Sequence, residues 1–362
     1  MTPLVNPLPP LPASAHCVEV SPMNRARVVC FGELLLRLGA PGHELLLQQP
    51  RLDVHCGGAE ANVGVSLSHF GHEVAMVSTV ADNPLGAAVT GELRRHGVDT
   101  RHVKRVDGRM GLYFLTTGAI HRPSEVIYDR ADSAFALAAA DAYDWPRLLQ
   151  GAQWLHLSGV SPALGAAVAE ATLAAARAAR AAGVKVSFDG NYRPKLWQRW
   201  QGDAAGILRE LFACADVVFA DYRDIGVVLG GEFTQPTLEQ RVEAAARQAF
   251  AAFPQLQLMA CTQRVAHNVD HHSLAAMLVP RDGAVARAPS EELTPIIDRI
   301  GGGDAFAAGV LHGLIEGWSL EDTVRFGLAA GCLKHSIPGD FNPLSVADVQ
   351  ACVGEARFDV KR

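Results

Sequence analysis

The stretch "IIDRIGGGDAFAAG", residues 296–309, joins a glycine turn to the start of a helix of small residues. Three successive glycines cost backbone entropy and offer no side chains to pack. The free N–H groups of such a turn, together with the positive end of a helix dipole, form a site for phosphate oxygens. Asp304 would stand beside this site as the acceptor of a hydroxyl proton. The pattern indicates phosphoryl transfer, although an acid at a helix start also simply stabilises the helix.

A second glycine turn enters a helix at residues 56–71, "CGGAEANVGVSLSHFG". Gly57 and Gly58 would let a polyol approach the backbone, and Asn62 would hydrogen-bond one of its hydroxyls. An ordinary turn followed by a helix start has the same pattern. By itself this stretch leaves both interpretations open.

Short apolar strands alternate with helical segments along the rest of the chain. The expected strands lie at residues 27–32, 73–80, 154–159, 185–190, 216–221 and 257–262. The expected helices lie at residues 58–70, 84–95, 164–182, 202–212 and 237–252. This alternation predicts an α/β fold with a doubly wound, mainly parallel sheet flanked by helices. Ligands of such a sheet bind at the carboxyl ends of its strands.

Two segments, residues 41–56 and 98–130, contain strand-like pieces and turn signals but no good helix. Strands without crossover helices cannot join a parallel sheet, so we expect them to form a small antiparallel lid over one end of the main sheet. Residues 1–24 are rich in proline and predict a mobile tail. Residues 25–362 are expected to form one domain.

The composition favours a soluble globular protein with small-molecule partners. The chain of 362 residues is 49% hydrophobic, carries a net charge of −6 and has no cluster of basic residues, which speaks against nucleic acid as a partner. Its apolar runs are too short or too rich in alanine to span a membrane. Seven cysteines without C-x-x-C spacing suit a reduced, cytoplasmic setting, and no convincing signal peptide precedes the first strand.

Two nucleotide-binding motifs are missing from the chain, which has neither G-x-x-x-x-G-K-[ST] nor G-x-G-x-x-G. Their absence excludes a P-loop enzyme and weakens the case for a nicotinamide-dependent dehydrogenase. His267, His271 and His272 fall in an expected hairpin loop. We interpret them as surface histidines, and no metal ligand is assigned.

Together "GGAEANVGVSLSHFG" and "DRIGGGDAFAAG" resemble the two signatures of the ribokinase-like (PfkB) family of carbohydrate kinases, and the similarity runs from about residue 27 to 345. The segments "GLYFL", "VIYDRADSA", "LHLSGVSPAL", "FDGNYRPKLW" and "CLKHSIPGDFN" are similar to the 2-keto-3-deoxygluconate kinases of that family. The resemblance implies ATP-dependent phosphorylation of 2-keto-3-deoxy-D-gluconate at its 6-hydroxyl, giving 2-keto-3-deoxy-6-phosphogluconate and ADP. It also implies Mg²⁺ at the ATP phosphates and a doubly wound kinase domain with a β lid.

The resemblance further implies a role for each matching residue. The anion hole and the catalytic base would be Gly301, Gly302, Gly303 and Asp304. The sugar would be held by Gly57, Gly58, Ala59, Glu60, Ala61, Asn62, Tyr113, Tyr128, Asp129, Arg130, Arg193, Asp304 and Asp340. The nucleotide would be held by Asn191, Tyr192, Arg193, Thr262, Arg264 and the three glycines.

The two arginines of the sugar group have a chemical reason of their own. A keto-acid sugar carries a carboxylate, and Arg130 and Arg193 each flank the end of an expected strand. Either guanidinium could bind that carboxylate through a two-pronged hydrogen bond. A solvated surface ion pair is the plain alternative for each.

The chain departs from the family pattern at three places. The usual D-T-x-G-A-G-D reads "DRIGGGD" at residues 298–304, and N-x-x-E reads "DYRD" at residues 221–224. The segment "CTQRVAHNVDHHS", residues 261–273, replaces a glycine-rich nucleotide loop. A kinase for fructose or a related hexose, or a non-catalytic sugar- or nucleotide-sensing module, therefore remains an alternative. The sequence leaves open whether the protein is a homo-oligomer.

Overall fold

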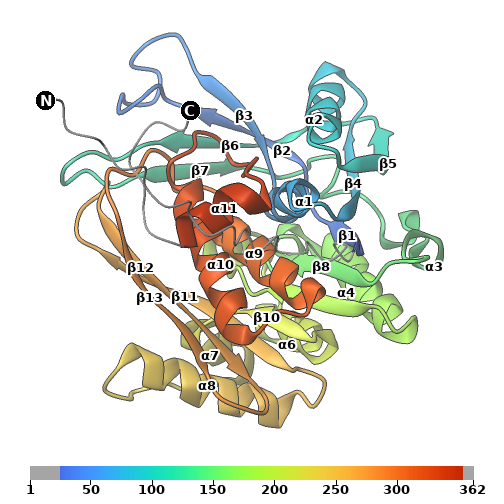
Figure 1. The fold of residues 1–362 in the computed structure, drawn as a ribbon. Helices are drawn as coiled ribbons and strands as arrows, with labels where there is room; N and C mark the ends of the chain where they lie inside the picture. Colours follow the sequence, from blue (N-terminus) through green and yellow to red (C-terminus); the bar gives the residue numbers. More distant parts are fainter. Residues whose placement is uncertain (1–24, 354–362) are drawn as a thin grey trace, which may run out of the picture.

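In residues 25–353, the part of the chain that the computed structural model describes, nine strands form one sheet in the order β13-β12-β11-β10-β9-β8-β1-β4-β5 (Figure 1). Their bounds are β1 (Arg27–Phe31), β4 (Glu73–Ala81), β5 (Asp99–Val106), β8 (Trp154–Ser158), β9 (Lys185–Asp189), β10 (Val217–Phe219), β11 (Leu258–Ala266), β12 (His272–Pro280) and β13 (Ala286–Leu293). The strands from β5 to β11 pair in parallel, and β12 and β13 add an antiparallel edge. The predicted mainly parallel α/β fold is confirmed. The predicted tail over residues 1–24 lies outside the described residues.

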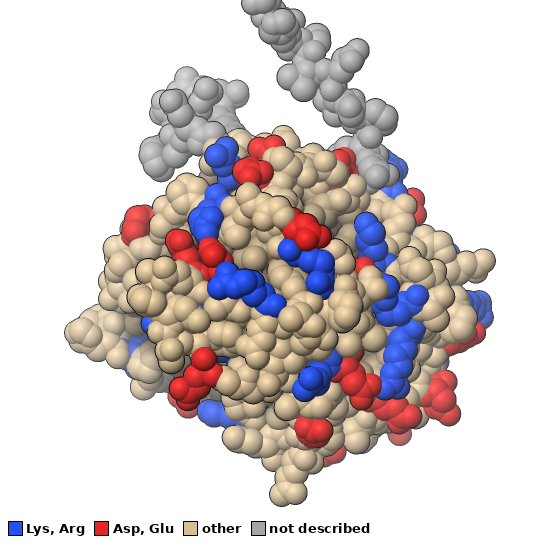
Figure 2. All heavy atoms as spheres, turned by 90° about the horizontal axis from the view of Figure 1, so that it is seen from below, with Lys and Arg blue, Asp and Glu red and all other residues tan. Residues whose placement is uncertain are grey.

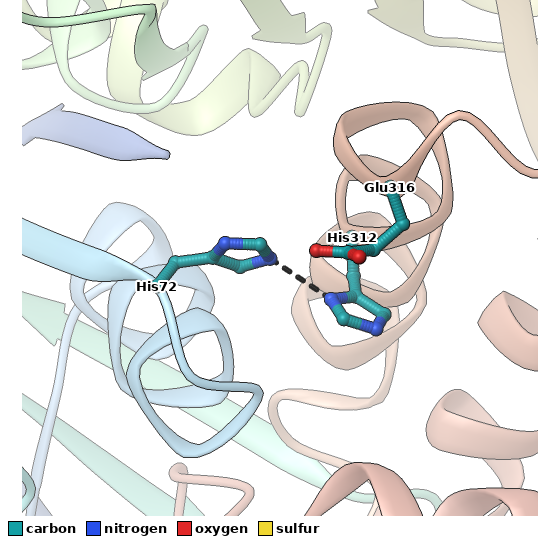
Figure 3. Close-up of side chains that lie close together, drawn as sticks. All are labelled: His72, His312 and Glu316. Carbon is teal, nitrogen blue, oxygen red and sulfur yellow. Dashed lines mark hydrogen bonds between the residues drawn. The ribbon is translucent and has the colours of Figure 1, made fainter. Parts of the chain in front are cut away.

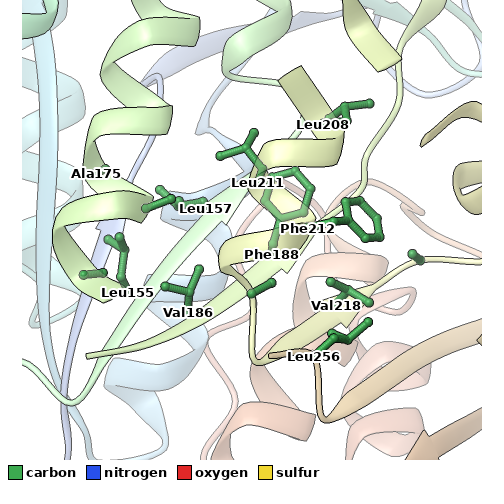
Figure 4. Close-up of a cluster of buried hydrophobic side chains, with 14 of the residues drawn as sticks. Leu155, Leu157, Ala175, Val186, Phe188, Leu208, Leu211, Phe212, Val218 and Leu256 are labelled. Carbon is green, nitrogen blue, oxygen red and sulfur yellow. The ribbon is translucent and has the colours of Figure 1, made fainter. Parts of the chain in front are cut away.

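Helices cover both faces of this sheet. Alternate residues of β1 show this, because Val28 and Cys30 pack into one apolar cluster while Val29 and Phe31 pack into another. The first cluster takes residues from α1 (Ala59–His69), α2 (Pro84–Arg95), α9 (Gly302–Glu316), α10 (Leu320–Lys334) and α11 (Val346–Val353). The second takes residues from α3 (Trp145–Leu148), α4 (Ala166–Ala181), α5 (Pro194–Trp200), α6 (Ala204–Cys214), α7 (Tyr222–Leu229) and α8 (Leu238–Ala252). Figure 4 shows part of the second cluster, in which Leu155 and Leu157 of β8 face the helical layer.

Four more strands of the described residues form a separate sheet in the order β3-β2-β6-β7. Their bounds are β2 (Leu35–Gly39), β3 (Asp53–Gly57), β6 (Gly111–Thr116) and β7 (Glu125–Asp129). The sheet is mixed rather than antiparallel throughout, because β2 and β6 run in parallel. The strand over residues 99–106, which we expected in the lid, is instead β5 of the main sheet. The preceding helix α2 provides the crossover that a parallel strand requires.

The surface carries charges of both signs. On the face in Figure 2, Lys and Arg side chains lie interspersed with Asp and Glu side chains among uncharged residues. This face therefore presents mixed local charges rather than a field of one sign. Within residues 25–353, every helix falls short of the length and apolar character that a membrane span needs.

Candidate active site

A cleft of about 1140 Å³ is lined both by residues at the carboxyl ends of main-sheet strands and by residues of the four-stranded sheet. Asp189 at the end of β9 and Thr262 on β11 represent the first group, and Tyr113 on β6 and Tyr128 on β7 the second. The residues of the sequence prediction that line it are Gly58, Ala59, Asn62, Tyr113, Tyr128, Arg130, Asn191, Tyr192, Arg193, Thr262, Arg264, Gly301, Gly303, Asp304 and Asp340. The position agrees with the rule for open parallel sheets.

Five predicted residues are not among those that line the cleft: Gly57, Glu60, Ala61, Asp129 and Gly302. The Glu60 carboxylate is buried, and its Oε1 accepts hydrogen bonds from the hydroxyls of Ser158 and Ser161 at 2.8 and 2.7 Å. Asp129 forms an ion pair with Arg109, 2.6 Å long, on the surface. Successive strand side chains point to opposite faces, so Asp129 points away from the face that carries Tyr128. The sequence prediction placed the Glu60 and Asp129 side chains at the sugar, whereas neither residue lines the cleft.

The glycine turn before α9 presents backbone donors to the cleft. Gly301 is the N-cap residue with φ of 80°, and a Cβ at this position would lie 2.1 Å from the backbone oxygen of Asp340. Gly303 has no atom within 4 Å of the place where its Cβ would be. The first bond of the helical ladder runs from the N–H of Ala305 to the carbonyl of Gly301 at 2.8 Å. The N–H groups of Gly303 and Asp304 therefore have no acceptor within the helix and are available to an anion.

Asp304 lies at this helix start and is held by Asn62, whose Nδ2 donates to its Oδ2 at 2.7 Å. Burial raises the pKa of Asp304 to about 7, and the charges of Glu60 and Asp340 act in the same direction. The hydrogen bond from Asn62 acts in the opposite direction, because it stabilises the ionised form. A carboxylate that titrates near neutrality is suited to accept a proton from a hydroxyl.

Asp189 and Asp224 are further carboxylates that line the cleft. Burial raises the pKa of Asp189 to about 8, and the charges of Asp304 and Asp224 add to the effect. Burial also raises the pKa of Asp224 to about 6. Asp224 and Asp221 form a capping box at the start of α7, in which Oδ2 of Asp224 accepts from the N–H of Asp221 at 2.9 Å. These carboxylates are oxygen donors of the kind that Mg²⁺ prefers, and a divalent cation would relieve their repulsion.

The two predicted carboxylate-binding arginines differ in their surroundings. Arg130 is 6% exposed, and its Nε donates to Oε2 of Glu33 at 2.6 Å, so much of its charge is already balanced. Arg193 is exposed, and its Nη1 donates to the backbone oxygen of Tyr192 at 3.1 Å. Arg193 is therefore better placed to meet a carboxylate from solution.

Sequence reasoning missed several residues of this region. Asp189 lines the cleft, and its position directly before Gly190 at the end of an expected strand was a usable signal. Arg299 also lines the cleft, although the sequence marked it only as a departure from the family pattern. Glu33 and Arg37 are buried charged residues, and nothing in the sequence marks their distant partners.

The histidines of residues 267–272 are not all at the surface. His272 lies in β12 with 2% exposure, so the sequence prediction was wrong for it. Oε2 of Glu292, on the neighbouring strand β13, lies 2.5 Å from Nε2 of His271, a contact that strand pairing creates. His267 and His271 remain on the hairpin between β11 and β12.

A second histidine group is formed by His72, which follows α1, and His312, towards the C-terminal end of α9, and both side chains are buried (Figure 3). Nε2 of His72 and Nδ1 of His312 are 2.8 Å apart, and Glu316 lies beside them. The hydrogen bond between the two rings uses Nε2 of His72 and Nδ1 of His312. A metal ion shared by the two rings would need the same two nitrogen atoms as ligands. At these two atoms the hydrogen bond and a metal ion shared by both rings exclude each other.

The sequence and the fold of this chain are similar to those of known carbohydrate kinases. Residues 25–346 match the pfkB family carbohydrate kinase domain. A 2-dehydro-3-deoxygalactonokinase of Haloferax volcanii is 35% identical over 338 residues, which cover 92% of this chain and 99% of that protein. A 2-dehydro-3-deoxygluconokinase of Bacillus subtilis is 27% identical, with 87% of this chain and 91% of that protein covered. The crystal structure of the 2-dehydro-3-deoxygluconokinase of Thermotoga maritima superposes with a TM-score of 0.85 at 36% identity, covering 91% of this chain and 98% of that one. The chain belongs to the PfkB family of carbohydrate kinases.

Proposed function

We propose that this carbohydrate kinase transfers the γ-phosphoryl group of ATP to the 6-hydroxyl of a 2-keto-3-deoxy acid sugar, with 2-keto-3-deoxy-D-gluconate as the first candidate. One observation carries the proposal: the glycine turn, Asp304 and Arg193 line a single cleft. The relatives named for 2-keto-3-deoxy acid sugars support the substrate class. The cysteine pattern of the sequence supports a cytoplasmic enzyme.

Phosphoryl transfer needs positioning and charge stabilisation more than covalent chemistry. The N–H groups at Gly303 and Asp304 would bind the oxygens of the transferred phosphoryl group, at the positive end of α9. Asp304 would accept the proton of the attacking hydroxyl. Thr262 and Arg264 on β11 line the same cleft and are the proposed contacts of the remaining phosphates.

The acidic residues of the cleft would hold Mg²⁺ when it is bound, and the ion would neutralise the charge of the ATP phosphates. Asp189 and Asp224 are the residues that fit this role, directly or through water. Burial is the main cause of their raised pKa values, and the charges of neighbouring carboxylates add to it.

The sugar would lie between Asn62, Asp304 and the four-stranded sheet. Tyr113 and Tyr128 offer hydroxyl groups from that sheet, and Arg193 offers a guanidinium to the carboxylate. Arg130 would act less strongly on the carboxylate, because Glu33 already binds its Nε.

A second candidate substrate is 2-keto-3-deoxygalactonate, a stereoisomer of the first. The relative from Haloferax volcanii, at 35% identity, carries the galactonokinase name and favours it. The two sugars share the carboxylate, the keto group and the terminal hydroxyl, so the residues assigned above serve both.

A coupled assay of ADP release tests the proposal, with both keto-deoxy acids, fructose and ribose as acceptors and Asp304→Asn as the matched blank. We expect the highest kcat/KM with one of the two acids. An equal or higher kcat/KM with fructose would contradict the acid-sugar assignment. ADP release no greater than that of the blank with every acceptor would favour the sensing module.

A further inference from the structure

Arg37 is a buried arginine that connects the four-stranded sheet to two loops of the main body. It lies on β2 with 2% of its side chain exposed. Its Nη1 and Nη2 donate to Oδ1 and Oδ2 of Asp298 at 3.1 and 2.6 Å. Its Nε lies 3.1 Å from Oδ1 of Asp340. The guanidinium thus binds one carboxylate with a two-pronged hydrogen bond and faces a second.

The carboxylate of Asp298 also orders the backbone that leads into the glycine turn. Its Oδ1 accepts from the N–H of Ile300, and its Oδ2 accepts from the N–H of Gly339, both at 3.0 Å. Ile300 directly precedes Gly301, and Gly339 directly precedes Asp340. One carboxylate therefore holds both loops, which are already in close contact where Gly301 meets the backbone oxygen of Asp340.

The charge balance of this cluster depends on Arg37. Asp298 is 13% exposed and Asp340 is 3% exposed. Burial alone would raise the pKa of Asp298, but the hydrogen bonds and charge of Arg37 hold that pKa below its ordinary value. Lys334 adds a second buried positive charge, and its Nζ donates to the backbone oxygen of Ile337 at 2.9 Å. Loss of the guanidinium would leave the buried carboxylate of Asp340 and the partly buried one of Asp298 without their main partner.

Arg37 does not line the cleft and is connected to it only through the residues that it contacts. Among the described residues that line the cleft, Asp340 is its direct partner, and Arg37 itself is absent from the lining. The hydroxyl of Tyr113 on β6 donates to Oδ2 of the same carboxylate at 2.7 Å. Asp340 therefore joins the buried arginine to a side chain at the sugar side of the cleft.

We propose that Arg37 is a positioning residue for phosphoryl transfer. Through Asp298 it sets the orientation of the glycine turn and of Asp304, and through Asp340 it fixes β6 against that turn. The inference rests on the proposed function, because it takes the glycine turn as the phosphate site. Charge alone is insufficient for this role: a lysine keeps the charge but loses the planar fork that holds both oxygens of Asp298.

Steady-state kinetics of Arg37→Lys and Arg37→Ala test the kinetic part, with the best acceptor of the wild-type enzyme. We expect kcat to fall about 10²-fold in both with little change in the KM for the sugar, since a displacement of about 1 Å has an effect of that size. Guanidinium chloride at non-denaturing concentration should restore part of the kcat of Arg37→Ala, while sodium chloride at equal concentration should not. The control is Arg101→Ala, which removes a similar fork to Asp99 from an arginine that is 82% exposed on β5.

Hydrogen exchange of residues 299–305 without any substrate tests the structural part. Exchange should be faster in Arg37→Lys than in the wild type and unchanged in Arg101→Ala. This readout separates the two proposals: a wild type that phosphorylates no sugar defeats the proposed function, while unchanged exchange in Arg37→Lys defeats the role of Arg37.

Two kinetic results would also overturn the positioning role. The first is a wild-type kcat in folded Arg37→Lys. The second is a change in KM alone, which would make Arg37 part of substrate binding. If Arg37→Ala does not fold, Arg37→Lys decides; failure of both to fold would show a purely structural residue and reject the proposal.

Discussion

The side-chain amide of Asn62 donates a hydrogen bond to the carboxylate of Asp304, with 2.7 Å between Nδ2 and Oδ2. Asn62 lies near the start of α1 and Asp304 near the start of α9, and a glycine turn precedes each helix. The contact therefore joins the two glycine motifs of the sequence in one place. Because the hydrogen bond stabilises the ionised carboxylate, it opposes the burial that raises the pKa of Asp304 to about 7.

The pH dependence of the kinase should follow this bond. A base must be ionised, so kcat/KM of the wild type should fall as the pH drops below about 7. Asn62→Ala removes a donor that lowers the pKa of Asp304, so its acidic limb should move to higher pH. The measurement is the pH at which kcat/KM falls to half of its plateau on the acidic side. This pH can be compared even if the plateau value of the variant is lower. A shift to lower pH would contradict the role of Asn62.

Asp304→Asn should cut turnover by roughly 10²–10⁴-fold, the usual range for the loss of a general base. Sugar binding should persist, because an amide of the same shape still fits beside Asn62. Turnover is measured by ADP release, and binding by calorimetry with the acid sugar. Near-normal turnover in the folded variant would remove Asp304 from the mechanism.

Arg193→Ala should reduce kcat/KM for the acid sugar more than for a neutral analogue, since only the acid needs a charged partner. Arg130→Ala should reduce kcat/KM for the acid sugar and for the neutral analogue by more similar factors, because it also leaves the buried Glu33 without its cation. Arg209→Ala on α6 is an exposed control. Equal losses on both substrates for Arg193→Ala would indicate a role at the nucleotide instead.

The buried pair of His72 and His312 predicts a loss of stability in acid (Figure 3). Burial lowers the pKa of His72 to about 4 and that of His312 to about 3, below the ordinary value of 6.5. The unfolded chain therefore binds more protons below pH 6.5, and the free energy of unfolding falls as the pH decreases from there towards 4.

Urea unfolding between pH 7.5 and 5, a range chosen around that pKa of about 6.5, measures this dependence. His312→Gln should make the slope shallower, because it removes one group that takes up a proton on unfolding. His121→Gln, at an exposed loop position, should leave the slope as it is. An unchanged slope in His312→Gln would show that His312 takes up no proton on unfolding and would contradict the prediction.

When ligands bind, we expect strands β6 and β7 of the four-stranded sheet to close over the cleft to different extents. Tyr113 ties β6 to Asp340, whereas β7 is at the sheet edge with Ile127 47% exposed. We expect the acid sugar and a non-hydrolysable ATP analogue to slow hydrogen exchange more in residues 125–129 than in residues 111–116. Identical exchange with and without these ligands would mean that this sheet does not act as a lid.

Much of the fold was readable from the sequence because its signals are local. Apolar periodicity predicted strands such as residues 27–32 and helices such as residues 84–95 close to their observed bounds. The two glycine turns marked the helix starts that meet in the cleft. The segment at residues 99–106 was misread, because strand type does not reveal which neighbour a strand will pair with.

Tertiary structure decided which charged side chains work together. Arg37 and Asp298 lie 261 residues apart, and Asn62 and Asp304 lie 242 apart, so no local pattern relates them. Burial, which raises the pKa of Asp304, is a property of the packed molecule as a whole. The sequence alone determined the fold class and where the glycine turns stand, since backbone preference and apolar periodicity act over a few residues. The partners of each charge depend on distances that exist only after the sheets and helices have packed.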